Sequence, residues 1–172
     1  LALAGVTLPV LECVVPLVWF FGKVRRLMCA VAMAGALAMT LAAAKRLIVE
    51  HQKLAAGTFD QFRPNRMLAG LTCGIVGFGG IGVATARLMR AMGCNVHALN
   101  RSGHTTEPVD WIGPVAALDT LLAASDIVVL SLPLTPATQG LIGARELGLM
   151  KRDAILVNLA RGEIVDEAAL FA

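Results

Sequence analysis

A glycine-rich hexapeptide at residues 77–82 restricts the possible folds of this chain more than any other feature. It reads Gly-Phe-Gly-Gly-Ile-Gly and follows an apolar run at residues 71–76. Residues 81–92 then have apolar side chains at helical spacing, and residues 94–99 are apolar again. A strand, a helix and a second strand within about thirty residues have the size of a βαβ unit. The hexapeptide is therefore expected at a strand-to-helix turn.

The same alternation continues along the chain. We expect a loop at residues 102–114, helices at 118–124 and 144–150, strands at 127–132 and 154–159, and a capped helical turn after Thr135-Pro136. Asp166 is expected to cap a last, short helix. Strands that alternate with helices predict the α/β class, with a parallel, doubly wound, Rossmann-like sheet.

In this context the pattern G-x-G-x-x-G is typical of a dinucleotide-binding turn. Gly77 would permit the tight turn, Gly79 would let the backbone approach a pyrophosphate, and Gly82 would let helix and strand pack closely. The phosphates would lie at the amino end of the helix. The residues expected to bind the dinucleotide here are Gly77, Phe78, Gly79, Gly80, Ile81 and Gly82.

The residues after the second strand bear on which dinucleotide is bound. An NAD enzyme places an acidic residue there for the ribose 2′-hydroxyl, whereas this chain has Asn100, Arg101 and Ser102. A carboxylate would repel a 2′-phosphate, but Arg101 and Ser102 would bind it. The sequence therefore predicts a cofactor site that prefers NADP over NAD. A solvated loop arginine without a ligand is the alternative.

The amino-terminal part is unusually apolar. Hydrophobic residues make up 57% of the chain and charged residues 16%, so some apolar surface is expected to meet another domain, a partner or lipid. Residues 27–44 carry no charge and are long enough for a marginal membrane span. Their Ala, Gly and Met content favours a buried helix of a soluble protein. A membrane anchor formed with residues 8–21 is the alternative, although Pro9 and Pro16 interrupt that run.

Composition argues against two other classes of site. The chain has no Tyr and its basic residues are scattered, so no nucleic-acid surface is expected. The cysteines are Cys13, Cys29, Cys73 and Cys94. They form no C-x-x-C pair, so we expect neither a metal site nor a disulfide framework, but reduced and mostly buried thiols in a cytoplasmic protein.

Three segments in order resemble the D-isomer-specific 2-hydroxyacid dehydrogenases, the family of D-lactate dehydrogenases, phosphoglycerate dehydrogenases and glyoxylate/hydroxypyruvate reductases. Residues 74–82 resemble the nucleotide loop of the family, residues 131–135 (Ser-Leu-Pro-Leu-Thr) its loop beside the cofactor, and residues 157–162 (Val-Asn-Leu-Ala-Arg-Gly) its substrate-arginine loop. The resemblance extends from about Ala32 to Leu170.

The resemblance implies an oxidoreductase that transfers a hydride between NAD(P)H and a small 2-keto or 2-hydroxy acid. Arg161 would then be the catalytic residue that pairs with the substrate carboxylate and polarises its carbonyl, since a guanidinium offers two parallel donors. The further cofactor-binding residues that the resemblance implies are Leu132, Pro133, Thr138, Leu159 and Ala160.

The chain also departs from the family pattern. The family's acid/base histidine lies beyond the arginine loop, and His51, His97 and His104 do not stand in its place. We therefore expect chiefly a coenzyme-binding part with a truncated sheet, the alternative being a catalytically silent dinucleotide-binding module. Residues 51–172 are assigned to the NAD(P)-binding domain and residues 1–50 to a remnant of the substrate domain and the inter-domain helix, with 1–30 unassigned. In the family the helix matching residues 31–47 supports a dimer, so a homodimer is expected for the full-length protein.

Overall fold

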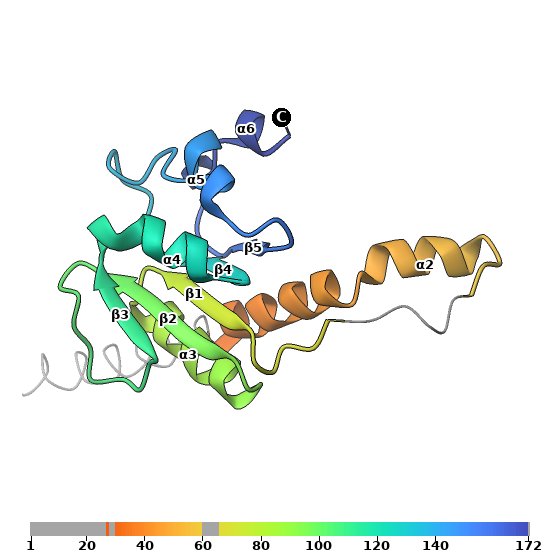
Figure 1. The fold of residues 1–172 in the computed structure, drawn as a ribbon, viewed down its shortest axis with the longest axis horizontal. Coiled ribbons are helices and arrows are strands. Elements are labelled where there is room, and N and C mark those ends of the chain that lie inside the picture. Colours follow the sequence, from red (N-terminus) through yellow and green to blue (C-terminus); the bar gives the residue numbers. More distant parts are fainter. Residues whose placement is uncertain (1–26, 28–29, 60–65, 172) are drawn as a thin grey trace, which may run out of the picture.

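The computed structural model describes Leu27 and residues 30–59 and 66–171, and it shows a five-stranded parallel sheet. The strand order is β3-β2-β1-β4-β5 (Figure 1). The strands are β1 (Thr72–Val76), β2 (Asn95–Asn100), β3 (Trp111–Pro114), β4 (Ile127–Leu130) and β5 (Ile155–Asn158). The strand order runs outward from β1 to β3, and the chain then returns to the other side of β1 to form β4 and β5. The sheet is therefore doubly wound, and the predicted Rossmann-like α/β class is confirmed.

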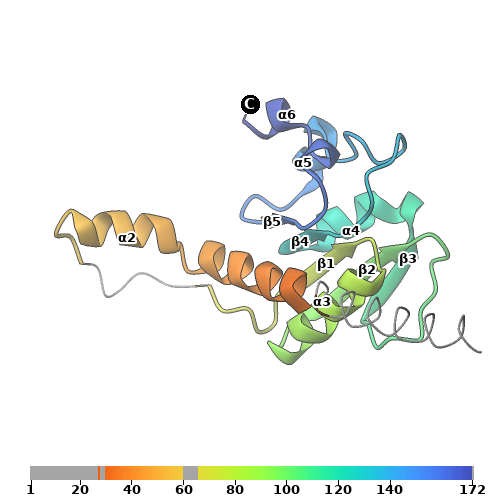
Figure 2. The same cartoon turned by 180° about the vertical axis from the view of Figure 1, so that it is seen from behind.

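Helices cover both faces of this sheet (Figures 1 and 2). The helices of the described residues are one at Ala30–Ala44, α2 (Leu47–Ala55), α3 (Gly80–Ala91), α4 (Leu118–Ala124), α5 (Ala144–Leu149) and α6 (Glu167–Leu170), with 3-10 turns at Val115–Ala117 and Gly162–Ile164. All but α2 lie against the sheet or its loops. Successive residues of a strand point to opposite faces of the sheet and belong to two separate apolar clusters. Ile75 packs with Met89 of α3, whereas its neighbour Val76 packs with Leu121 of α4. The period of two in the strands thus builds one core on each side.

Two acidic side chains fix the amino ends of the strands. Asp126, just before β4, accepts a hydrogen bond of 2.9 Å from the Thr72 backbone N–H, and its other oxygen lies 3.0 Å from Lys151 Nζ. Asp110, just before β3, accepts one of 2.7 Å from the Val96 N–H in the same way. Both contacts lie at the end of the sheet opposite the glycine loop. They tie neighbouring strands together where the ladder of β1 and β2 begins.

The predicted strands and helices lie within one or two residues of the observed ones, with one error. Residues 102–114 do not form a continuous loop, because Trp111–Pro114 is the edge strand β3, paired in parallel with β2. The Trp111 ring packs against His97 with centroids 5.7 Å apart. Pro114 ends the strand at the sheet edge, where a missing N–H is tolerated. Asp166 caps α6 as expected, accepting from the N–H groups of Ala168 and Ala169.

The helix at Ala30–Ala44 is less buried than predicted. Ala36, Thr40 and Ala44, spaced four residues apart, are buried, and Ala44 belongs to the core cluster of β1 and α3. Val31 is 65% exposed and Met39 is 45% exposed on other faces of the helix. Beside this stripe of small side chains, Leu37 and Leu41 are partly buried and pack against the core, whereas the other faces of the helix are exposed.

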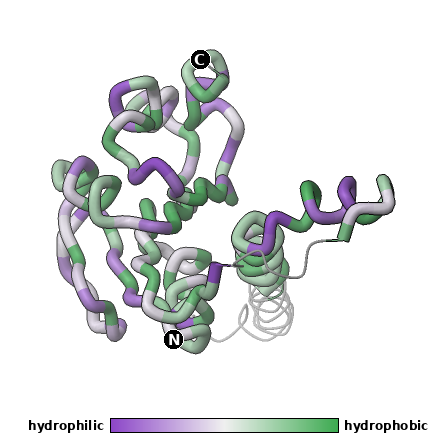
Figure 3. The backbone as a smooth tube through the Cα atoms, turned by 45° about the vertical axis from the view of Figure 1, so that its right-hand side comes forward, coloured by the Kyte–Doolittle hydropathy of each residue, from purple (hydrophilic) through white to green (hydrophobic). Residues whose placement is uncertain are grey.

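After Ala44 the chain bends by 54° and continues as α2. Arg46 at the bend has a left-handed backbone with φ 52°, and no α2 residue is buried. Figure 3 shows α2 extending away from the sheet as an arm. Among the described residues, no single helix is long and apolar enough to cross a membrane, and this bent pair passes such a test only when both helices are counted together. The predicted domain boundary after residue 50 falls inside α2 and stays a prediction; residues 8–21 lie outside the described residues.

Cys73 and Cys94 are buried thiols, as predicted. Burial raises the pKa of both thiols above its usual value, so they are protonated at neutral pH. Cys13 and Cys29 lie outside the described residues.

Candidate active site

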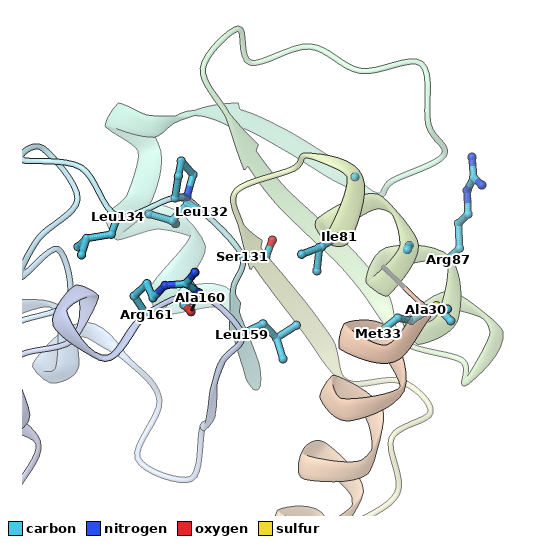
Figure 4. A pocket seen from close by; sticks show the side chains of 13 residues that line it. Ala30, Met33, Ile81, Arg87, Ser131, Leu132, Leu134, Leu159, Ala160 and Arg161 are labelled. Atoms are coloured by element: carbon cyan, nitrogen blue, oxygen red, sulfur yellow. Dashed lines mark hydrogen bonds between the residues drawn. The ribbon is translucent and has the colours of Figure 1, made fainter. Parts of the chain in front are cut away.

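An open cleft of about 1060 Å³ lies at the carboxyl ends of β1, β4 and β5 (Figure 4). In a doubly wound sheet this edge, where the strand order reverses, is where ligands bind. The cleft is lined by Ala30 and Met33 of the first helix, Gly80, Ile81, Ala84 and Arg87 of α3, Ser131, Leu132, Pro133 and Leu134 after β4, and Leu159, Ala160 and Arg161 after β5. Its walls are mainly apolar, with polar groups supplied by Ser131, Arg87 and Arg161.

The glycine loop is shaped by close contacts with the loop after β4. Gly77 has φ 99°, and a Cβ there would lie 2.7 Å from the Ser131 carbonyl oxygen, so only glycine fits. A Cβ at Gly82 would lie 2.3 Å from the Gly77 carbonyl oxygen. The N–H groups of Gly77 and Phe78 both donate to the Leu99 carbonyl oxygen, at 3.1 and 2.9 Å. These contacts hold the backbone close against its neighbours.

Gly79 is different, because no atom of the described residues requires a glycine there. A Cβ on Gly79 would meet nothing within 4 Å, and its φ of −96° suits any residue. Gly79 is the residue immediately before α3, whose first N–H groups have no partner within the helix. The open space at this position therefore fits a group that approaches the backbone from outside the protein, as an anionic pyrophosphate does.

The loop after β2 is organised by Asn100. Its Oδ1 accepts hydrogen bonds from the Gly103 N–H at 2.7 Å and the Ser102 hydroxyl at 3.2 Å, and its Nδ2 donates to the His104 carbonyl oxygen at 2.8 Å. Arg101 lies in this turn and is exposed. Asn100, Arg101 and Ser102 lie beside the cleft and not in its lining.

The loop after β4 forms the expected turn but not the expected cap. The Thr135 carbonyl oxygen accepts from the Thr138 and Gln139 N–H groups, both at 3.0 Å, which makes a turn and not a helix. The roles of the two threonines are reversed: the Thr138 hydroxyl accepts from the Thr135 N–H at 2.8 Å and donates to the Pro133 carbonyl oxygen at 2.8 Å. Thr138 thus supports Pro133, which lines the cleft, without lining it itself.

Arg161 stands at the mouth of the cleft (Figure 4). Asn158 holds the turn before it, since its Oδ1 accepts from the Ala160 N–H at 2.9 Å and its Nδ2 donates to the Arg161 carbonyl oxygen at 2.8 Å. The guanidinium is exposed and donates one hydrogen bond, of 3.0 Å, to the Ala160 carbonyl oxygen. Among the described residues it forms no ion pair with an acidic side chain. Most of its donors are therefore available to an incoming anion.

Seven of the fifteen predicted site residues line the cleft, and the other eight lie outside its lining. Those in the lining are Gly80, Ile81, Leu132, Pro133, Leu159, Ala160 and Arg161. Those outside it are Gly77, Phe78, Gly79, Gly82, Asn100, Arg101, Ser102 and Thr138. The lining residues that were not predicted as site residues are Ala30, Met33, Ala84, Arg87, Ser131 and Leu134. Arg87 follows Ile81 and Ala84 at steps of three along α3, which is the helical signal for a shared face.

Arg87 also connects the cleft to the loop before β3. Its guanidinium makes two hydrogen bonds to the Glu107 carboxylate, and Arg90, one turn further, contacts Asp110 at 3.1 Å. The hydrogen bonds with Arg87 lower the pKa of Glu107 below its usual value. The loop that follows Asn100 is thus held against α3 by two ion pairs.

The described histidines lie away from the cleft. His51 is on α2, His104 is in the loop after β2, and His97 is within β2. Burial lowers the pKa of His97, although Asp110 acts in the opposite direction. No histidine of the described residues lines the cleft. The polar groups of the cleft suit the binding of anions. The described lining residues include no histidine or carboxylic acid that could act as a general acid.

Known proteins share this arrangement. Residues 37–172 match the family model of the D-isomer specific 2-hydroxyacid dehydrogenase, NAD binding domain. The glyoxylate reductase of Thermococcus kodakarensis is 40% identical over 140 residues, which cover 77% of this chain and 42% of that protein. The glycerate dehydrogenase of Methylorubrum extorquens is 45% identical over 103 residues, covering 60% of this chain and 30% of that protein.

Solved structures agree with the sequence matches. The D-isomer specific 2-hydroxyacid dehydrogenase from Xanthobacter autotrophicus Py2, in complex with NADPH and MES, has a TM-score of 0.72 at 35% identity over 83% of this chain and 45% of that one. The NAD complexed form from Lactobacillus delbrueckii ssp. bulgaricus has a TM-score of 0.73 at 30% identity, over 83% of this chain and 43% of that one. The chain spans less than half the length of these relatives. Because the family model covers most of its length, the chain belongs to the D-isomer specific 2-hydroxyacid dehydrogenases through their NAD-binding domain.

Proposed function

We propose that this chain is the coenzyme-binding part of an NAD(P)H-dependent reductase of small 2-keto acids. The observation that carries the proposal is that the amino end of α3 and the Arg161 guanidinium open on one cleft. A dinucleotide and a small carboxylate bound there would be neighbours. Relatives named glyoxylate reductase and glycerate dehydrogenase support a small hydroxy or keto acid as the substrate.

The residues present fit a dinucleotide. We place the pyrophosphate at the amino end of α3, where Gly79 leaves open space, and the nicotinamide half beside Leu132, Pro133, Leu159 and Ala160 in the apolar part of the cleft. The adenosine ribose would face the loop after β2. When bound in reduced form, the nicotinamide supplies the hydride. The apolar lining would pack against the nicotinamide ring where that transfer would occur.

We further propose that the site prefers NADP(H) over NAD(H). Asn100, Arg101 and Ser102 bring no carboxylate to the end of β2, and the Arg101 side chain is exposed in the turn. The first acidic residue of the loop, Glu107, is already paired with Arg87. A 2′-phosphate would therefore meet a guanidinium and a hydroxyl and no competing anion.

Arg161 is proposed to bind the substrate carboxylate. Its free donors at the cleft mouth suit two parallel hydrogen bonds to a carboxylate, and a guanidinium there also polarises the neighbouring carbonyl. The alkoxide that forms on reduction needs a proton, and no described histidine lines the cleft to give it. We therefore expect this chain alone to bind coenzyme with little or no turnover, which is also the behaviour of the alternative, a catalytically silent dinucleotide-binding module.

The arm suggests a partner. Leu47, Ile48 and Leu54 of α2 are 59 to 73% exposed, and α2 buries no residue. We propose that a second copy of the full-length protein covers this surface, in preference to lipid or nucleic acid, and that the protein works in the cytoplasm. Sedimentation of the purified full-length protein tests this, because a monomer at micromolar concentration would contradict it.

Coenzyme titration tests the central part of the proposal. The fluorescence of NADPH or NADH is followed as the 172-residue chain is added. We expect saturable binding of both, with the dissociation constant of NADPH about tenfold or more below that of NADH, since a charged hydrogen bond contributes about 1.5–3 kcal/mol. Tighter binding of NADH would contradict the NADP preference, and no binding of either would contradict the proposed function.

A further inference from the structure

The Asn100 side chain has almost no bonding capacity left for a ligand. Oδ1 accepts two hydrogen bonds, from the Gly103 N–H at 2.7 Å and the Ser102 hydroxyl at 3.2 Å. Nδ2 donates to the His104 carbonyl oxygen at 2.8 Å. A carboxamide has two acceptor lone pairs and two N–H hydrogens, so both acceptor positions and one of the two donors are used inside the loop.

These three bonds close the turn in which Arg101 lies. The turn is further restricted at Gly103, whose φ is +69° and whose missing Cβ would lie 3.2 Å from the Pro114 nitrogen. Asn100 at the end of β2 and Pro114 at the end of β3 are paired residues of the sheet. The turn is therefore anchored to the sheet edge at one end and by the Asn100 carboxamide along its length.

In an NAD enzyme an acidic residue near the end of the second strand contacts the ribose directly, and Asn100 is the last residue of β2. If Asn100 had that direct role, its carboxamide would point free into the ribose site. It is instead engaged with the three residues that follow Arg101. Any effect of Asn100 on coenzyme preference is therefore indirect, through the conformation of the loop that it holds.

We infer that Asn100 is a positioning residue for coenzyme preference: its carboxamide holds the turn at residues 101–104, including the Ser102 hydroxyl, so that the Arg101 guanidinium faces the 2′-phosphate of NADP(H). The inference rests on the proposed binding of NADP(H) at this loop. Preorganisation of this kind raises affinity because the loop does not have to be ordered on binding. It benefits NADPH more than NADH, since the 2′-phosphate is the group that the turn addresses.

Asn100→Asp separates the positioning role from a ligand role. A carboxylate still accepts from Gly103 and Ser102 but cannot donate to the His104 carbonyl oxygen, which it repels. The positioning role predicts that NADPH binding weakens about tenfold or more, while NADH binding does not improve. A direct ligand role predicts the opposite for NADH, because the new carboxylate would accept from the ribose 2′-hydroxyl.

Gly103→Ala disturbs the same turn without any change of charge. A Cβ in the left-handed region is strained, and here it also meets Pro114. We expect NADPH binding to weaken about tenfold and NADH binding to stay within about twofold. Gly70→Ala is the matched control, because Gly70 has φ +82° with nothing within 4 Å and lies at the other end of the sheet. Asn95→Asp at the start of β2 is the control for Asn100→Asp.

The measurement is the ratio of the NADH and NADPH dissociation constants for these four variants and the unaltered chain. A merely structural role would lower stability and leave this ratio unmoved, as we expect for Gly70→Ala and Asn95→Asp. A fall in the ratio for both Asn100→Asp and Gly103→Ala, without tighter NADH binding, supports the inference. Tighter NADH binding in Asn100→Asp, or an unchanged ratio, overturns it.

Hydrogen exchange of the Gly103 amide in the free chain provides a test that needs no coenzyme. The amide is expected to be protected in the unaltered chain and to lose protection in Asn100→Ala, because its acceptor is removed. Equal exchange in the two chains overturns the positioning role. A chain that binds neither nucleotide but shows the protection contradicts the proposed function and leaves the loop architecture standing, so the two failures are distinguishable.

Discussion

The Ser131 hydroxyl donates a hydrogen bond of 2.6 Å to the carbonyl oxygen of Gly77, 54 residues earlier in the chain. The bond joins the loop after β4 to the glycine loop after β1, at the point where a Cβ on Gly77 would strike the Ser131 backbone. Two loops from neighbouring strands are thereby joined, and the lining residue Ser131 is fixed against the glycine loop.

Ser131→Ala removes this bond. We expect the free energy of unfolding to fall by about 1 kcal/mol and NADPH binding to weaken severalfold, because the glycine loop is no longer held to the loop after β4. Chemical denaturation and coenzyme titration measure the two effects. Ser125→Ala is the matched control, since the Ser125 hydroxyl also donates at 2.6 Å, to Leu121, outside the cleft lining. Equal loss of coenzyme affinity in both variants would show that Ser131 has no special place in the site.

Arg161→Ala tests the substrate site. Loss of the guanidinium is expected to weaken the binding of glyoxylate to the chain–NADPH complex by about tenfold to a hundredfold, since charged hydrogen bonds contribute about 1.5–3 kcal/mol each. NADPH affinity should stay within about twofold. The quenching of bound NADPH fluorescence by added glyoxylate is the readout. Arg145→Ala provides the control, because Arg145 is exposed, pairs with Asp119 and lies outside the cleft lining. Loss of NADPH binding in Arg161→Ala would show that the arginine serves the coenzyme instead.

Asp126 predicts a dependence of stability on pH. Burial raises the pKa of its carboxyl, but the Thr72 N–H and Lys151 bonds outweigh burial, so the pKa lies below its usual value of 3.8. A depressed pKa contributes stability that is present above the unfolded value and is lost as the pH falls through the folded value. We expect Asp126→Asn to be less stable than the unaltered chain at pH 7, with the difference shrinking below about pH 4. Urea denaturation at several pH values checks this. A constant difference would contradict it, and exposed Asp119→Asn should show a smaller effect.

Much of this fold follows from local sequence patterns. The apolar runs predicted β1, β2 and β4, which lie inside the sheet, where parallel strands need continuous apolar residues. They also predicted β5, which lies at the end of the described sheet and is only partly buried. The edge strand β3 escaped prediction because Trp111 to Pro114 is short, contains glycine and proline, and is held by the Trp111–His97 contact and by pairing with β2. Those contacts join residues distant in sequence, so a local sequence pattern does not predict them.

The candidate site was predictable to a similar degree. The glycine loop and Arg161 stand at strand ends, where a motif and a strand boundary locate them. Arg87 and Met33 line the cleft because two helices pack side by side, which the sequence does not specify. The hydrogen bonds of Asn100 within its own loop likewise depend on backbone geometry, which a sequence motif does not specify.

Gly79→Val in the coenzyme titration tests the central claim most directly. A Cβ at Gly79 would meet no atom of the described residues within 4 Å, so the variant should fold with an unchanged melting temperature, yet the valine side chain would occupy the space proposed for the pyrophosphate. Gly148→Val, at another unfilled position, is the control. The account predicts that NADPH binding is lost in Gly79→Val and kept in Gly148→Val. Undiminished NADPH binding by a well-folded Gly79→Val chain would contradict the placement of the coenzyme at the amino end of α3.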